Sequence, residues 1–226
     1  MDAKRAAAER AVEWLEDGMT VGLGTGSTVY HFIQAVGRKV ADGLTIKAVA
    51  TSVRSEQLAR QLGIPMISFS DVEDIDVTID GADEVDPEWN LIKGGGGALL
   101  REKIVADASK RLIVIIDESK LVRHLGQFPL PVEVVPFAFE LTQRKLRQLG
   151  CELRMRMAAD AQPYRTDNGN FTMDCEFGPI EQPGLLADAL HRIPGVVEHG
   201  LFIGMAAQVI VGRSDGTVDV LDRPRP

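Results

Sequence analysis

The chain of 226 residues contains few of the residues that mark several protein classes. Two cysteines, Cys151 and Cys175, are too few for a disulfide framework, so we expect a reducing, cytoplasmic setting and two buried thiols; a single bridge between them is the alternative. Basic residues are also scarce, with 25 Lys and Arg against 33 Asp and Glu, which argues against a nucleic-acid partner. An acidic chain can still bind an anion where its cations gather locally.

Long apolar runs are missing as well. No stretch reaches the roughly 18–20 residues that a membrane-spanning helix needs, and Met1 to Leu15 form a charged, alanine-rich segment without the apolar centre of a signal peptide. The sequence therefore predicts no membrane association. The histidines share no spacing motif, and we interpret them as structural residues. The four histidines are His31, His124, His191 and His199.

What remains is the composition of an ordinary globular protein, with 45% hydrophobic and 26% charged residues. Up to about residue 127, short apolar strands alternate with helices. Such alternation predicts right-handed crossovers and a mostly parallel, Rossmann-like sheet with helices on both faces. The expected strands are 19–24, 44–50, 65–69, 75–79 and 111–116, and the expected helices are 3–16, 29–40, 53–62 and 98–109.

The pattern changes near Phe128-Pro-Leu-Pro131, which we interpret as a linker. The order that follows predicts a smaller α+β domain of the split βαβ, ferredoxin-like type, completed by a strand near Leu201 or Val209. A terminal hairpin around Ser214-Asp-Gly216 is expected to return to the first domain. We therefore predict a catalytic domain of residues 1–127 plus about 205–226, and a second domain of residues 128–204. The elements expected after the linker are strand 132–135, helix 139–149, strands 151–157 and 170–176, helix 185–192, and hairpin strands 208–212 and 217–221.

A run of four glycines, Gly94 to Gly97, stands between Lys93 and a stretch of good helix formers. Glycines let the backbone adopt positive φ and approach a ligand closely, and a helix that starts there presents N–H groups to an anion or an oxyanion. Glu102 falls early in this helix. A cation, backbone donors and a carboxylate on one segment suit proton transfer beside a carbonyl. A hairpin tip followed by a helix with solvated charges is the alternative.

A second glycine-containing motif, Gly22-Leu-Gly-Thr-Gly-Ser-Thr28, stands between a predicted strand and a predicted helix. It is not a dinucleotide-binding fingerprint, because Ser27 occupies the place of the last glycine, and it is not a Walker loop, because Gly-Lys-Ser/Thr is missing. Glycines and hydroxyls at a helix start suit a phosphate monoester. The alternative is a tight turn in which Ser27 or Thr28 caps the helix.

Two further motifs follow predicted strands. Asp80-Gly81-Ala82-Asp83 offers two carboxylates for sugar hydroxyls or for Mg²⁺, with an ordinary Asx turn as the alternative. Lys120 suits a phosphate or sugar oxygen, unless it is a plain surface lysine. All four motifs stand on the strand-to-helix side of successive units, so we expect them on one rim of one sheet, where open α/β sheets bind ligands.

In order and spacing these motifs closely resemble those of the type A ribose-5-phosphate isomerases. The resemblance rests on Gly22–Thr28, Asp80–Asp83, Lys93–Ala98 with Arg101-Glu-Lys103, and Asp117–Lys120, and it covers essentially the whole chain. It implies a cofactor-independent, cytoplasmic enzyme that interconverts D-ribose 5-phosphate and D-ribulose 5-phosphate through a cis-enediolate, in the non-oxidative pentose phosphate pathway. It also implies a homodimer or homotetramer.

The resemblance further implies a role for each matching residue. Glu102 corresponds to the catalytic base. Lys93, with Gly94, Gly95 and Gly96, corresponds to a substrate-binding loop that stabilises the enediolate, and Asp80 corresponds to a residue that helps to open the sugar ring. The other matches are to residues that contact the sugar or its phosphate: Thr25, Gly26, Ser27, Thr28, Gly81, Ala82, Asp83, Lys120 and, in the first predicted helix, Lys4. No metal ligand is implied.

Two other functions are weighed against this one. Sugar-phosphate-sensing regulatory domains have a similar fold, but such regulators carry a helix-turn-helix ahead of the domain, whereas about twenty residues precede Gly22 and the net charge is −8. A nucleotide-dependent oxidoreductase is disfavoured by Ser27 in the place of a glycine. The sequence therefore predicts the isomerase, with the sugar-phosphate sensor as the alternative.

Overall fold

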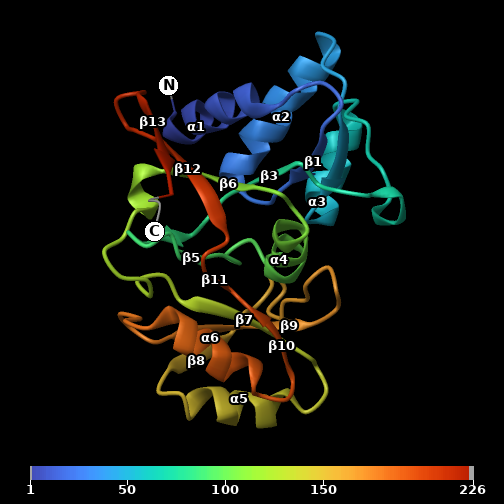
Figure 1. Ribbon diagram of the computed structural model, residues 1–226. Coiled ribbons are helices and arrows are strands. Elements are labelled where there is room, and N and C mark those ends of the chain that lie inside the picture. Colours follow the sequence, from blue (N-terminus) through green and yellow to red (C-terminus); the bar gives the residue numbers. More distant parts are fainter. Residues whose placement is uncertain (1, 224–226) are drawn as a thin grey trace. The chain divides into compact units, whose positions relative to one another are not determined.

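The computed structural model of the protein describes residues 2–223 (Figure 1). By its internal contacts the chain divides into two compact units. The first unit holds residues up to 82, 101–120 and from 205 onward, and the second holds residues 83–100 and 121–204. Compared with the expected domains, this division assigns residues 83–100 and 121–127 to the second unit. No helix in the described part of the chain is both long and apolar enough to cross a membrane.

The first unit is built on a six-stranded sheet, which confirms the predicted mostly parallel α/β fold. Its strand order is β13-β12-β6-β3-β1-β2, in which only β13 is antiparallel to its neighbour. Because the other five strands run in one direction, their carboxyl ends meet along one edge of the sheet. The strands are β1 (Thr20–Leu23), β2 (Lys47–Ala50), β3 (Val77–Asp80), β6 (Leu112–Asp117), β12 (Ala206–Gly212) and β13 (Val218–Asp222).

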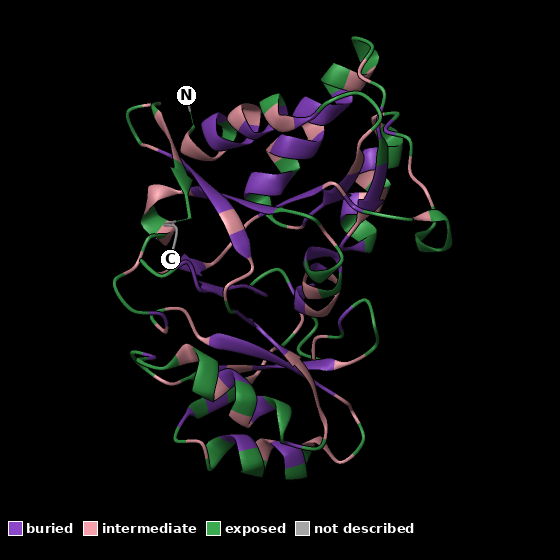
Figure 2. Ribbon diagram, viewed as in Figure 1, coloured by how far each residue is buried: buried purple, intermediate pink, exposed green. Residues whose placement is uncertain are grey.

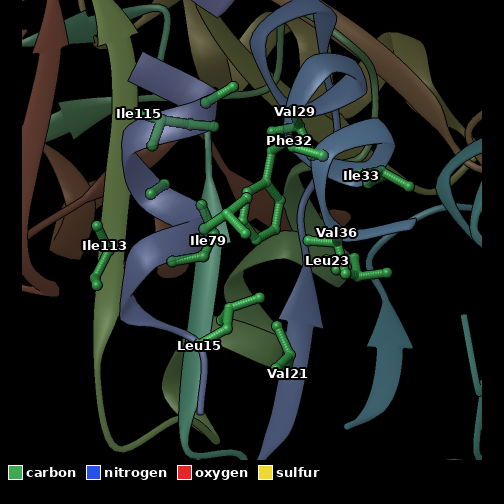
Figure 3. Packing of buried hydrophobic residues seen from close by; sticks show 14 of the residues in the cluster. Leu15, Val21, Leu23, Val29, Phe32, Ile33, Val36, Ile79, Ile113 and Ile115 are labelled. Atoms are coloured by element: carbon green, nitrogen blue, oxygen red, sulfur yellow. The ribbon is translucent and has the colours of Figure 1, made fainter. Parts of the chain in front are cut away.

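Helices pack on both faces of this sheet, and its central strands β3 and β6 are therefore buried along nearly their whole length (Figure 2). On one face, Phe32 of α2 packs among Leu23 and Ile79 of the sheet (Figure 3). Successive side chains of a strand point to opposite faces of the sheet. Ala48 of β2 packs in the cluster that contains Phe32, while the next residue, Val49, packs with Val105 of α4 on the other face. The helical segments are α1 (Ala3–Ala11), η1 (Val12–Trp14), α2 (Ser27–Ala41), α3 (Val53–Gln61), η2 (Phe69–Asp71), α4 (Leu99–Asp107) and η3 (Glu118–Lys120).

The second unit contains a four-stranded antiparallel sheet of order β10-β7-β9-β8. With one helix after β7 and another after β9, this is the predicted split βαβ arrangement. A separate three-stranded sheet has the order β11-β5-β4. The elements are β4 (Glu84–Val85), β5 (Leu91–Ile92), β7 (Leu130–Val134), α5 (Phe139–Arg147), β8 (Glu152–Met155), β9 (Phe171–Glu176), α6 (Pro183–His191), β10 (Val196–His199) and β11 (Leu201–Phe202).

Several local expectations were wrong. The strand expected at 65–69 is reduced to one bridge between Ala48 and Met66, because the Ser68 side chain accepts the N–H of Ser70 and starts the turn η2. The strand that completes the second unit is β10, which precedes Leu201. The expected linker at 128–131 is partly strand, since Leu130 and Pro131 pair with β9. Whether these segments form strands depends on the distant strand with which they pair, and the local sequence pattern does not specify that strand.

The packing of α2 predicts a large effect for Phe32→Ala. Phe32 is fully buried, so we expect the substitution to lower the free energy of unfolding by about 3–5 kcal/mol. Lys39→Ala, at an exposed position of the same helix, serves as the control and should change it by less than about 0.5 kcal/mol. Urea denaturation measures both values. A loss below about 1 kcal/mol for Phe32→Ala would show that α2 does not anchor this core.

Candidate active site

Three of the four sequence motifs follow neighbouring parallel strands of the first unit. Gly24 follows β1, Gly81 follows β3, and η3 with Lys120 follows β6. Since β1, β3 and β6 are adjacent, the sheet brings these motifs to one edge, as predicted. The glycine loop (Gly94–Gly97) does not belong to this set: it follows β5 of the three-stranded sheet in the second unit. The short strand β5 pairs with β4 and β11 instead of joining the large sheet.

The 25–28 loop opens α2. Gly26 is the N-cap residue, with φ 128°, and among the described residues no side chain caps this helix. The alternative that Ser27 or Thr28 is the cap was therefore wrong, because both lie inside the helix. The Nζ of Lys4, from the first turn of α1, donates to the Ser27 Oγ at 3.0 Å. A helix start, a hydroxyl and a cation together form an arrangement that suits an anion.

A hydroxyl cluster (Thr25, Thr51, Ser52 and Ser55) holds the start of this loop. The Thr25 Oγ1 lies 2.8 Å from the Oγ1 of Thr51 and 2.8 Å from the Oγ of Ser52. Ser52 also caps α3 by accepting the N–H of Ser55, whose own Oγ donates to the Gly24 carbonyl at 2.6 Å. Sequence analysis did not include Thr51, Ser52 or Ser55 among the site residues. Their place after β2, next to β1, was the signal that could have linked them to the loop.

Asp80 joins the end of β3 to the 25–28 loop. It is only 1% exposed, and its Oδ1 accepts the N–H groups of Thr25, at 3.0 Å, and of Gly81, at 2.7 Å. Two backbone donors on one carboxylate oxygen hold the side chain in position. The contact with Thr25 goes beyond an Asx turn, because it bridges two strand ends.

Glu102 and Lys120 also belong to the first unit. Glu102 lies in the first turn of α4 and is only 3% exposed. The positive end of the helix dipole favours a carboxylate at such a position. Lys120 ends the turn η3 and is half-buried. Glu102 is thus a buried carboxylate on a rigid element, and Lys120 stands at the carboxyl edge of the sheet.

The second unit carries Asp83, Lys93 and the glycine loop. Lys93 is 2% exposed, its N–H donates to the Gly200 carbonyl at 2.8 Å, and its Nζ lies 5.4 Å from the centroid of the Phe202 ring. The Oδ2 of Asp83 accepts the N–H of Gly95 at 2.7 Å. The structure therefore brings Asp83 to the glycine loop, where it holds one end of a turn closed by the hydrogen bond from Gly97 N–H to Gly94 O.

A metal could be held by one group in the described part of the chain, His191, Glu198 and His199, whose ligand atoms lie within 4.8 Å of one another. These residues lie on α6 and β10, and none belongs to the predicted site. The Nδ1 of His199 accepts the N–H of Leu201 at 3.2 Å, so the neutral ring carries its proton on Nε2. That tautomer offers no Nε2 lone pair to a metal, which argues against this group as a metal centre.

The two cysteines are free and buried in the second unit. A hydrogen bond with Cys151, together with burial, raises the pKa of the Cys175 thiol. Because the thiolate is the reactive form, Cys175 is an inert core residue at neutral pH.

Comparison with known proteins places these features in one family. The model of "Ribose 5-phosphate isomerase A (phosphoriboisomerase A)" matches residues 47–216. The ribose-5-phosphate isomerase A of Parvibaculum lavamentivorans is 54% identical over 98% of both chains, and that of Bacillus mycoides is 53% identical over 96% of this chain and 98% of the relative. A solved structure of D-ribose-5-phosphate isomerase in complex with phospho-erythronic acid matches with a TM-score of 0.95, 43% identity and 98% coverage of both chains.

The contact between Gly24 and Asp80 predicts that Gly24→Ala disrupts the loop. An added Cβ would lie 2.1 Å from the Asp80 Oδ1 and 2.7 Å from its Cα, so the strand end itself must move. We expect a loss of about 1–3 kcal/mol in the free energy of unfolding. Gly184→Ala is the control, since a Cβ there meets no atom within 4 Å and alanine suits its helix. Equal stability of the two variants in thermal unfolding would contradict the tight contact.

Proposed function

We propose how the residues of this chain, which belongs to the ribose 5-phosphate isomerase A family, divide the work of one isomerisation. The enzyme interconverts ribose 5-phosphate, an aldose, and ribulose 5-phosphate, a ketose, and so serves the pentose phosphate pathway. The observation that carries this function is the similarity to named isomerases over 98% of the chain.

The reaction sets three requirements. A base removes the proton from C2 of the open-chain aldose, the negative charge that develops on the cis-enediolate is stabilised, and a proton returns at C1. The phosphate, which does not react, supplies binding energy that holds the carbon chain in place. Because only protons move and no electrons leave the sugar, the scheme needs no redox cofactor.

Glu102 is the proposed base. Its carboxylate is buried in the first turn of α4, at the helix start that follows the glycine loop. A position on a regular helix holds the carboxylate more precisely than a loop would. The family resemblance assigns the same role to this position.

Lys93 and the loop of Gly94, Gly95 and Gly96 are the proposed enediolate stabilisers, the loop acting through N–H groups other than that of Gly95, which Asp83 accepts. Gly95 and Gly96 are exposed on the turn, whereas Lys93 is buried beneath it. A cation and backbone N–H groups require little reorganisation when the charge appears, and one such donor is typically worth about 2.7–4 kcal/mol. With these groups carrying the charge, no metal is required.

The phosphate is assigned to the 25–28 loop. Gly26, Ser27 and Thr28 lie at the start of α2, and the Lys4 Nζ already touches Ser27. Thr25 supports the loop through the hydroxyl cluster and Asp80. A helix start with a lysine beside it recognises a phosphate by charge and by directed N–H donors together.

The remaining polar groups are assigned to the sugar. Asp80 is the proposed proton carrier in ring opening, and the segment of Gly81, Ala82 and Asp83 contacts sugar hydroxyls. Lys120, at the end of β6, contacts a sugar or phosphate oxygen. The support is that Asp80 and Lys120 follow adjacent strands of one sheet.

We also propose a homodimer or homotetramer in the cytoplasm. The support is a set of large apolar side chains exposed on the second unit, among them Phe137, Leu141 and Leu185. Light scattering of the purified protein decides the assembly, and a monomeric mass at micromolar concentration would refute the oligomer.

The phosphate assignment predicts the effect of replacing both Ser27 and Thr28 by alanine. We expect KM for ribose 5-phosphate to rise at least about 10-fold, the size of one lost hydrogen bond to a charged group. Because the phosphate takes no part in the chemistry, kcat should change much less. Ser70→Ala, an exposed serine of η2, is the control. An unchanged KM in steady-state kinetics would remove the 25–28 loop from the site.

The base assignment predicts that Glu102→Gln lowers kcat by about 10²–10⁴-fold, because glutamine keeps the size of the side chain but cannot take a proton at neutral pH. KM should change little, since the phosphate contacts lie elsewhere. Glu73→Gln, an exposed loop position, is the control. The decisive measurement is exchange of the C2 proton of the substrate with solvent. Exchange at the wild-type rate in Glu102→Gln would assign the base to another carboxylate.

A further inference from the structure

Arg156 reaches the glycine loop from a position about sixty residues later in the chain. It follows directly after β8, and its Nη1 donates to the Gly94 carbonyl at 2.8 Å and to the Gly95 carbonyl at 3.3 Å. One guanidinium nitrogen thus holds two successive carbonyl groups of the turn. Both partners belong to the second unit, so the contact is internal to it.

The guanidinium is itself held by Asp174 of β9. The Nε donates to Asp174 Oδ2 at 3.0 Å and the Nη2 donates to Oδ1 at 2.5 Å, which makes the pair bidentate. The two side chains are only 16% and 27% exposed. A fork-to-fork pair fixes the plane of the guanidinium, so the direction in which Nη1 points is set by the sheet and not by a flexible side chain.

Two other side chains close around the loop. The Asp83 carboxylate accepts the Gly95 N–H at 2.7 Å. The ring of Tyr164 packs on Gly97, where an added Cβ would lie 2.3 Å from the Tyr164 Oη. The Arg156 guanidinium lies 6.0 Å from the centroid of that ring. The loop is therefore held at successive peptide groups, even though its glycines by themselves would leave it flexible.

The geometry of the peptide group determines where the N–H groups of the glycine loop point. In a planar trans peptide, the C=O and the N–H point to opposite sides. Since Arg156 holds the Gly94 and Gly95 carbonyls, the N–H groups of Gly95 and Gly96 point away from it. Asp83 occupies the first of these donors, and Gly96, which is exposed, presents the second on the side away from Arg156.

We propose that Arg156 is a positioning residue for the isomerisation: with Asp174 as its anchor, it orients the glycine loop so that the Gly96 N–H faces the developing enediolate charge. This inference rests on the proposed role of the glycine loop and deepens it. Arg156 touches the carbonyl side of the loop and acts through the loop, so its removal should affect the transition state more than the bound sugar phosphate.

The test compares Arg156→Met and Arg156→Lys with Arg154→Met. Arg154 lies two residues earlier, on β8, and is exposed, and the ion pair described for it is with Glu176 at 3.8 Å, so it matches Arg156 in charge and segment without a described hydrogen bond to the loop. We expect Arg156→Met to lower kcat about 10²-fold, the size of a displacement of about 1 Å in a catalytic group. KM should change less than about 3-fold. Lysine, which keeps one charged donor, should restore part of the loss, and Arg154→Met should keep the wild-type kcat.

Two inhibitors separate positioning from a general structural defect. Phospho-erythronic acid carries a carboxylate whose two oxygens resemble the enediolate, whereas inorganic phosphate occupies only the phosphate site. Arg156→Met should weaken inhibition by phospho-erythronic acid by about the same factor as it lowers kcat, and inhibition by inorganic phosphate should stay as in the wild type. Should Arg156→Met fail to fold, Arg156→Lys and Asp174→Asn undergo the same measurements.

A folded variant with wild-type kcat, or one in which KM alone rises, would overturn the proposal. So would equal weakening of both inhibitors. These results differ from a failure of the proposed function, in which the wild-type protein itself would not isomerise ribose 5-phosphate, or would keep its rate when the glycine loop is altered by Gly96→Pro.

Discussion

Parallel pairing of β1, β3 and β6 is the constraint on which the first unit depends. Strands that run in one direction must all leave the sheet at the same edge, so every segment that follows them begins there. The 25–28 loop, the Asp80 turn and the Lys120 turn are thereby brought to the same edge although successive ones are about 40 to 50 residues apart in sequence. The two residues of each contact between these loops are close together once the sheet has formed, because the paired strands fix the positions of both.

Buried carboxylates and a half-buried guanidinium then hold the loops that follow the strands. Asp80 holds Thr25, Glu84 accepts the N–H groups of Gly126 and Phe128 at 2.6 Å each, and Arg156 with Asp174 holds the glycine loop. A buried charge without hydrogen bonds is costly, whereas bonds to charged groups contribute about 1.5–3 kcal/mol each. Carboxylates and a guanidinium placed beneath loops therefore order backbone that its own residues would leave flexible.

Glu133 shows that this device is not restricted to the proposed site. It is fully buried in β7, and its Oε1 accepts hydrogen bonds from Thr166, Asn168 and Asn170. The turn that these three residues form leads into β9, which carries Asp174. The strand β9 therefore links the turn at 166–170, which Glu133 holds, to Asp174, which holds Arg156.

The sequence by itself determined most strands and helices of the first unit, the motifs at their ends and the family, because apolar periodicity, glycine spacing and helix starts are local properties. It did not determine that β5 would pair with β11, that β10 would complete the second sheet, or that Met66 would make a single bridge, because strand pairing depends on distant partners. The hydroxyl cluster around Thr25 and the hold of Arg156 on Gly94 were likewise decided only by the tertiary structure. Each joins residues 26 to 62 positions apart, and a hydrogen bond between side chains of ordinary type leaves no pattern in the chain until the fold has brought them within 3 Å.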